Sequence, residues 1–161
     1  MKDNALIITR VFSAAVERVW RAWTDPDEAK KWWGPKDFTA PAIAIDFRVG
    51  GKALFCMRGK PSPEAPEQDF WSTGTYKEIV PMKRIVTTDS FSDADGTIVS
   101  PTKYGMPPDF PKELTVILSF EETPDEKTKM TLQHVGMPEG KIREQTSHGW
   151  NQSFDKLEKI L

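Results

Sequence analysis

Hydrophobic residues recur at two different spacings along this chain. Between positions 40 and 135 they often occupy every second position, as in Leu114, Val116, Leu118 and Phe120, a pattern typical of strands with one buried face. Near both ends the spacing becomes i, i+3, i+4, i+7, which indicates amphipathic helices. The change of period predicts a set of strands lying between helical segments.

The elements expected from these patterns follow the order strand, two short helices, six strands and one long helix. Strands are expected at 6–12, 43–47, 52–58, 70–80, 84–91, 114–120 and 130–134, and helices at 14–23, 26–33 and from about 139 to 161. Gly50-Gly51 indicates a tight hairpin turn, and Gly74 a bulge. A six- to seven-stranded antiparallel sheet with one apolar face should curve around the single long helix, which gives an α+β fold.

Four of the six tryptophans lie between positions 20 and 33. Asp25-Pro26 is typical of the cap and first turn of a short helix, and Gly34-Pro35 is expected to end that helix. Adjacent helical residues point about 100° apart, so the rings of Trp32 and Trp33 should diverge. We expect Trp32 to pack beneath the first helix and Trp33 to approach the rim of an interior cavity.

Seven short motifs occur in an order that covers nearly the whole chain. They are Ala22-Trp-Thr-Asp-Pro26, Trp32-Trp-Gly-Pro35, Asp46-Phe-Arg-Val-Gly-Gly51, Met57-Arg-Gly59, Gly74-Thr-Tyr-Lys-Glu-Ile-Val-Pro81, Arg84-Ile-Val86, and Gly149-Trp150 followed by Phe154 and Leu157. Together they resemble the START-like (SRPBCC) helix-grip superfamily, and more closely its branch named after the activator of the heat-shock-protein-ninety ATPase. Two features depart from that branch: a polar run at 87–90 and a longer insertion at 92–112.

The resemblance implies a single START-like helix-grip domain over residues 1–161, with a hydrophobic cavity between the sheet and the C-terminal helix. Members with this name include binders, resistance proteins and many of unknown role, so the resemblance implies no single activity. A stress-response role and a heat-shock ATPase as partner follow only from the name of the branch.

Composition narrows the classes of partner. The 161 residues carry a formal net charge of −2, with basic and acidic residues interspersed, which gives no electrostatic case for nucleic acid or an anionic membrane. The single cysteine, Cys56, allows no internal disulfide and fits a reducing cytoplasm. The apolar stretch near the N-terminus is too short for a signal or membrane segment. We expect a cytoplasmic protein.

The alternation directs a set of candidate cavity residues toward the C-terminal helix. His134 continues the phase of Met130 and Leu132, and Asp89 continues that of Ile85, so both polar residues should share the interior. The directions of Tyr76 and Glu78 stay open because they follow the expected bulge. The candidate ligand-binding set is Trp33, Phe47, Phe55, Met57, Tyr76, Asp89, Leu118, His134, Trp150 and Phe154. Each apolar member could equally be ordinary core, and His134 a satisfied structural histidine.

The segment 92–112 contains Tyr104, Met106 and Phe110, apolar residues that a fully solvated loop would not need. It is expected to be a lid over one mouth of the cavity, or else to pack on the outer sheet face or pair with a second subunit in a homodimer. No metal site is expected, because His134 and His148 lack recognisable ligand spacing and the Asp93-Ala-Asp-Gly96 turn lacks the final Glu of a calcium loop. No cofactor motif is recognised.

Three functions remain from the sequence. The first is binding of a small hydrophobic or amphipathic ligand, with His134, Tyr76 or Asp89 holding its polar end. The second is an enzyme, such as a hydrolase or cyclase, that uses His134 as an acid–base group, although no nucleophile, metal or cofactor motif supports it. The third is a co-chaperone adaptor of a heat-shock ATPase.

Overall fold

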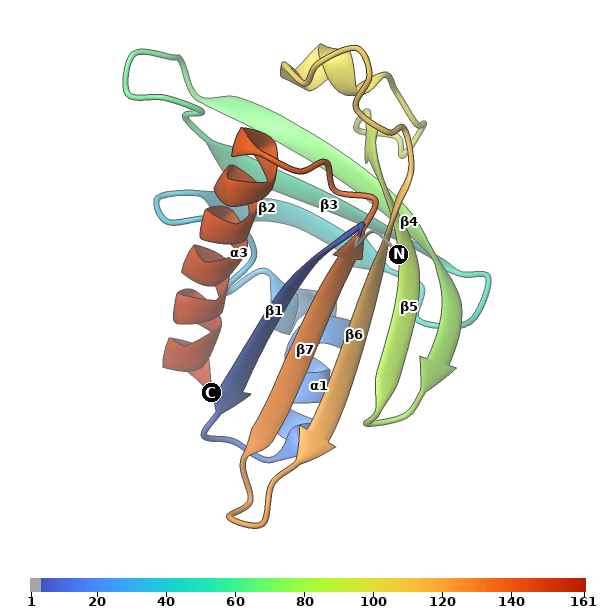
Figure 1. Cartoon of the computed structure of the whole chain (residues 1–161), viewed down its shortest axis with the longest axis vertical. Coiled ribbons are helices and arrows are strands. Elements are labelled where there is room, and N and C mark those ends of the chain that lie inside the picture. The colour runs from blue at the N-terminus through green and yellow to red at the C-terminus, as the bar shows by residue number, and fades with distance from the viewer. Residues whose placement is uncertain (1–3) are drawn as a thin grey trace.

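Seven antiparallel strands form one curved sheet in the order β1-β7-β6-β5-β4-β3-β2 in a computed structural model that describes residues 4–161 (Figure 1). The strands are β1 (Ala5–Phe12), β2 (Thr39–Ile45), β3 (Lys52–Gly59), β4 (Gln68–Val80), β5 (Arg84–Ser92), β6 (Leu114–Glu122) and β7 (Thr128–Val135). Strands β2 to β7 follow the chain, and β1 closes the edge beside β7. The predicted strand order is confirmed.

Helices α1 (Val16–Thr24) and α2 (Pro26–Ala29) follow β1, and α3 (Lys141–Ile160) ends the chain. Asp25 caps α2 by accepting a hydrogen bond from the Asp27 amide at 2.9 Å, as Asp25-Pro26 predicts. However, α2 ends at Ala29, earlier than predicted. The Trp33 amide still bonds to the Ala29 carbonyl, and residues 30–32 continue as turns. The long helix lies across the sheet as the helix-grip fold requires.

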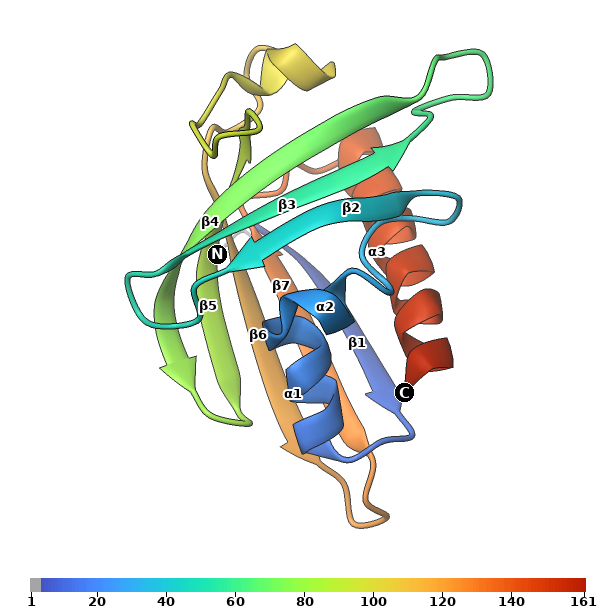
Figure 2. The ribbon, with the colours of Figure 1, turned by 180° about the vertical axis from the view of Figure 1, so that it is seen from behind.

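The sheet has an inner face toward the helices and an outer face. The strand register places alternate residues of β6 and β7 on the inner face, because Val116 pairs with His134, Leu118 with Leu132 and Phe120 with Met130. These side chains are buried together with those of α1 and α3. Figure 2 shows α1 and α2 lying in front of β6 and β7, and the main contacts of α1 and α3 with the sheet are to β6 and β1.

The bulge in β4 lies between Tyr76 and Glu78, not at Gly74 as predicted, and it decides the two directions that the sequence left open. The register shifts between Tyr76, which pairs with Thr87, and Glu78, which pairs with Val86. Tyr76 is therefore buried, while Glu78 faces solvent and bonds to Arg84. Gly74 lies nearby, where a side chain would collide with the Thr88 carbonyl oxygen, which explains glycine at this position.

The hairpin between β2 and β3 is longer than predicted. The strand ends at Ile45, so Phe47 belongs to a six-residue connection that includes Gly50-Gly51 instead of extending the strand. The Arg48 amide bonds to the Asp46 carbonyl, and the Gly51 amide to the Arg48 carbonyl, so the turn includes both glycines, and Gly50 adopts a positive φ of 85° in it. Within residues 4–161 no helix is long and apolar enough to span a membrane.

Candidate functional site

Three side chains from different elements form a hydrogen-bonded row at the inner face. His134 of β7 lies with Nε2 at 2.8 Å from Asp89 Oδ2 of β5, and Trp150 of α3 places Nε1 at 3.2 Å from His134 Nδ1. Asp89 pairs with Leu114 and His134 with Val116, so the Asp89–His134 bond passes diagonally over β6. The row ties the first half of α3 to the middle of the sheet.

The hydrogen-bond pattern assigns the histidine tautomer. An indole N–H can only donate, so His134 Nδ1 must accept from Trp150. The proton of the neutral ring is then on Nε2, which donates to the Asp89 carboxylate. Both ring nitrogens of His134 are occupied, and the residue is 5% exposed. The side chain of Asp89 is 33% exposed, so the carboxylate is the accessible end of the row.

Partly exposed apolar side chains lie beside Asp89 on the inner face of β3, β4 and β5. The register pairs Met57 with Phe70 and Phe55 with Ser72, and Ser72 in turn with Phe91. We call Phe55, Met57, Phe70, Asp89 and Phe91 the open strip, because all five are partly exposed. The strip lacks the helix cover that buries the neighbouring strands.

Trp33 and Trp150 border this strip. The ring of Trp33 stacks on Phe55 with centroids 4.3 Å apart and meets Trp150 edge-on at 5.6 Å. Trp32, by contrast, is fully buried and donates its indole N–H to the Ala22 carbonyl at 3.0 Å. Trp32 lies beneath α1 and Trp33 is partly exposed, but the predicted divergence of the two rings is wrong, because their centroids are 5.4 Å apart and the rings contact each other.

The candidate residues from the sequence do not all meet. Trp33, Phe55, Asp89, His134 and Trp150 are connected by ring contacts and hydrogen bonds, and Met57 belongs to the same strip. Phe154 and Leu118 are buried in the core. Phe47 and Tyr76 form a separate group. The ring centroid of Phe47 lies 5.1 Å from that of Tyr76 and 5.7 Å from that of Trp20.

Burial makes Tyr76 unsuitable as a reactive phenol. Its side chain is 5% exposed, and desolvation raises the pKa of the phenol well above its usual range. Tyr76 therefore stays neutral, and it lies apart from the Asp89–His134–Trp150 row.

The long connection 92–112 lies against the strip. It contains the short helix η1 (Pro101–Tyr104), and the Tyr104 hydroxyl donates to the Ser92 carbonyl at 2.6 Å. The ring centroid of Tyr104 lies 5.3 Å from that of Phe91 and 5.7 Å from that of Phe70. Phe110 is buried beside Phe91. Figure 1 shows η1, in yellow, beyond the upper end of β5. Met106 also packs on the core, so all three predicted lid residues are partly or fully buried.

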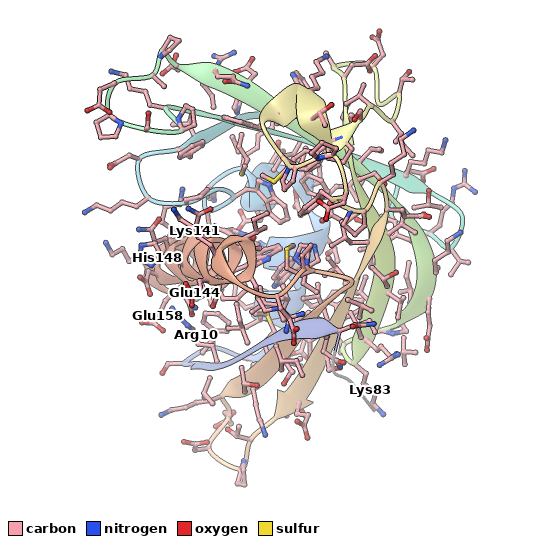
Figure 3. The ribbon with its side chains drawn as sticks, turned by 45° about the horizontal axis from the view of Figure 1, so that its top comes forward. Arg10, Lys83, Lys141, Glu144, His148 and Glu158 are labelled. Carbon is pink, nitrogen blue, oxygen red and sulfur yellow. The ribbon has the colours of Figure 1, made fainter. Side chains whose placement is uncertain are left out.

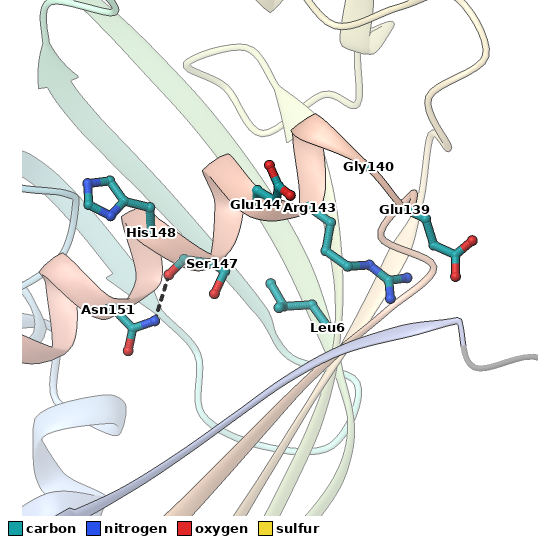
Figure 4. A pocket seen from close by; sticks show the side chains of 8 residues that line it. All are labelled: Leu6, Glu139, Gly140, Arg143, Glu144, Ser147, His148 and Asn151. Carbon is teal, nitrogen blue, oxygen red and sulfur yellow. Dashed lines mark hydrogen bonds between the residues drawn. The ribbon is translucent and has the colours of Figure 1, made fainter.

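Two surface hollows lie away from this strip. One, of about 680 Å³, runs between Leu6 of β1 and the first half of α3, where Arg143, Ser147 and Asn151 line it (Figure 4). Figure 3 shows the polar side chains of Lys141, Glu144 and His148 projecting from α3 away from the sheet. The second, of about 490 Å³, lies between Val16, Met82 and Phe120. Mixed charge in the first hollow gives no clear ligand preference.

Metal and thiol chemistry find no support in the described part of the chain. Residues 4–161 contain no group of three or more His, Cys, Asp or Glu side chains arranged to hold a metal ion. Asp93 instead accepts the amides of Asp95 and Thr97, as in an ordinary turn. Cys56 is fully buried, and desolvation raises the pKa of its thiol, which lowers its reactivity.

Phe70 and Phe91 are members of the strip that the sequence analysis did not select. Both lie near the ends of predicted strands, where alternation is shortest. Alternation could have identified Phe91, because it occupies the next alternate position after Ile85, Thr87 and Asp89.

With this geometry in place, comparison with known proteins defines the class. Residues 13–161 match the family described as "Activator of Hsp90 ATPase homolog 1-like protein", and the chain belongs to that family. It has the START-like helix-grip fold of that branch. No curated protein matches the chain.

Solved structures of similar proteins agree on the fold. A protein from Chromobacterium violaceum is 26% identical, with a TM-score of 0.75 over 98% of this chain and 97% of that one. The AHSA1 protein from Silicibacter pomeroyi is 20% identical, with a TM-score of 0.71 over 97% and 96% of the two chains. A protein from Mycobacterium smegmatis is 21% identical, with a TM-score of 0.75 over 96% and 88%.

Proposed function

We propose that this protein binds a small hydrophobic or amphipathic ligand on the open strip, with the polar end of the ligand at Asp89. The carrying observation is that apolar side chains and one carboxylate are partly exposed side by side on the inner face. Soluble proteins rarely leave such groups accessible without a function, and an apolar surface with a few polar groups is the usual form of a small-molecule site.

Binding on this strip involves the segment 92–112. Tyr104 lies against Phe70 and Phe91 at the aromatic end of the strip, so a ligand that reaches this end has to displace Tyr104 or pack beneath it, and Met106 packs on the core nearby in the chain. We therefore include Tyr104, Met106 and Phe110 in the proposed site as a lid. A reducing compartment such as the cytoplasm suits this protein, whose one cysteine is buried and unpaired.

An acid–base enzyme is less well supported than binding. His134 has no free ring nitrogen for a substrate, because Trp150 occupies Nδ1 and Asp89 accepts from Nε2. A heat-shock ATPase partner rests on the family name, and stimulation of that ATPase by the purified protein would test it separately.

The test combines two measurements. Native mass spectrometry of freshly purified protein should detect a co-purifying small molecule, and the neutral dye Nile red should become fluorescent on the protein and be displaced by decanol. Trp33→Ala should weaken Nile red binding about tenfold, the effect of losing one aromatic contact. Trp71→Ala is the matched control, because Trp71 pairs with Cys56 and so points to the outer face.

The proposal fails if no ligand mass is detected and Nile red fluorescence is unchanged by the protein. Equal weakening by Trp33→Ala and Trp71→Ala would also argue against it, since the dye would then be binding elsewhere.

A further inference from the structure

The Asp89–His134–Trp150 row has used all of its hydrogen-bond donors. The indole N–H of Trp150 is given to His134 Nδ1, and the single N–H of the neutral imidazole is given to Asp89. An anionic or acceptor group on a ligand would find no free N–H in this row. It would also have to approach a carboxylate.

The acceptor side of the row is incomplete. His134 uses Asp89 Oδ2, and within residues 4–161 the other carboxylate oxygen, Oδ1, has no hydrogen-bond partner. Among the described residues, the one ion-pair partner of Asp89 is His134, whose ring is neutral in this arrangement. No cationic Lys or Arg side chain of the described chain therefore lies against this carboxylate, at a site that is only one-third exposed.

Three cationic side chains on or beside α3 are bonded to groups other than Asp89. Arg10 pairs with Asp155 at 2.7 Å, and the Lys156 ammonium donates to the carbonyls of Pro35 and Phe38. Arg143 donates to the Met137 carbonyl. Within residues 4–161 no Lys or Arg side chain forms an ion pair with Asp89, so the carboxylate is available to a cation on a ligand.

The surroundings of Asp89 suit a cation with an apolar body. Gly74 lies on β4 between the Thr73–Ser90 and Tyr76–Thr87 pairs, so no side chain stands beside Asp89 on that strand. Phe91 lies two residues beyond Asp89 on the same face of β5. The indole of Trp150 is hydrogen-bonded to His134, which in turn bonds to Asp89. Partly exposed aromatic rings attract cations through their faces.

Building on the proposed function, we propose that the ligand is an amphipathic amine, whose protonated nitrogen donates to Asp89 and whose hydrocarbon chain lies on the open strip. Charge-assisted hydrogen bonds are roughly twice as strong as neutral ones, so an ammonium group gains more at this carboxylate than a hydroxyl group does. A fatty acid or phosphate ester is the disfavoured class.

The test uses three probes that share one hydrocarbon chain: decylamine, decanol and decanoate, each titrated at neutral pH as a competitor of Nile red. Decylamine should bind about tenfold more tightly than decanol, and decanoate should bind more weakly than both. Asp89→Asn keeps an oxygen for the His134 N–H but removes the charge, so decylamine should fall to the affinity of decanol. Asp95→Asn, which removes the same charge from an exposed turn, should change none of the three affinities.

The outcomes separate the two proposals. If decanoate binds as well as decylamine, or if Asp89→Asn leaves the preference for decylamine intact, the amine proposal is overturned while ligand binding stands. If none of the three displaces Nile red from the folded protein, both proposals fail. Thermal unfolding of Asp89→Asn verifies that the variant is folded.

Discussion

The two halves of the inner face have the same strand geometry but different cover. On β6, β7 and β1 the inward side chains lie under α1 and α3, and residues such as Leu118, Met130 and Leu132 are 0–2% exposed. On β3, β4 and β5 the equivalent positions Phe55, Phe70 and Phe91 stay partly exposed. The first half behaves as a hydrophobic core, whereas the second is core at Ala53, Tyr76 and Ile85 and is partly exposed along the open strip.

The difference shows that one fold can separate stability from binding. Burial of an apolar side chain contributes about 1.5–3 kcal/mol, so most of the stabilisation should come from the covered half. The open strip can then accept a ligand without breaking the core. Four experiments test this division.

The largest effect is expected from removing the cover itself. A chain ending at Gly140 lacks α3, including the fully buried Phe154 and Leu157. Because several such deletions of about 2–5 kcal/mol each exceed the usual stability of a domain, cooperative unfolding in urea should disappear. A chain lacking only Leu161 is the control. A sharp transition in the chain ending at Gly140 would contradict the assignment of the core.

The two adjacent tryptophans compare the halves directly. Trp32→Ala should destabilise the protein by about 3–5 kcal/mol, because the ring is fully buried and its N–H is bonded. Trp33→Ala should cost only about 1–2 kcal/mol, because that ring is partly exposed. Urea unfolding measures both values. Equal losses would mean that Trp33 belongs to the core.

Truncating one side chain in each half to alanine should give a smaller difference in stability between the covered half and the open strip. Leu132→Ala on β7 should cost about 2–5 kcal/mol, since Leu132 has no exposed surface. Met57→Ala on β3 should cost less than about 1.5 kcal/mol, because part of its surface is already in water. If Met57→Ala proves the more damaging change, the strip is part of the stable core.

The smallest effect concerns the loop over the strip. In the free protein the Phe110 amide should exchange slowly, since Phe110 is buried, while Lys103 and Met106 should exchange faster. Adding decylamine should slow exchange at residues 102–106 and leave β7 unchanged. Hydrogen exchange with and without the amine measures this. Protection of 102–106 that does not depend on the ligand would point to static packing.

The sequence predicted the strands more fully than it predicted the site. Local sequence pattern predicted all seven strands, with alternation the main signal between positions 40 and 135, and phase alone placed His134 and Asp89 on one face. Their contact could not be predicted, because it spans β6 and depends on the β5–β6 register after a connection of 21 residues from 93 to 113. Register across so long a loop is set by packing, not by local pattern.

The alternation of residues along a strand also does not predict burial where a bulge or turn changes the backbone. Tyr76 and Glu78 are two positions apart and would share a face in a regular strand, yet the bulge buries one and exposes the other. Similarly, Phe47 has the right phase for a strand but lies in the turn after Ile45, where it packs on Trp20 instead of lining the strip.

The position of β1 has a consequence for how the protein is made. Thr9 and Thr131 are neighbours across the β1–β7 edge, although they are 122 positions apart in sequence. Pairings of such long range slow folding, because the chain must close a large loop before it gains any contact. During synthesis the first strand waits, with Leu6 and Ile8 uncovered, until β7 has left the ribosome. The N-terminal strand is therefore the segment of a nascent chain most open to capture by chaperones or by a second unfinished copy.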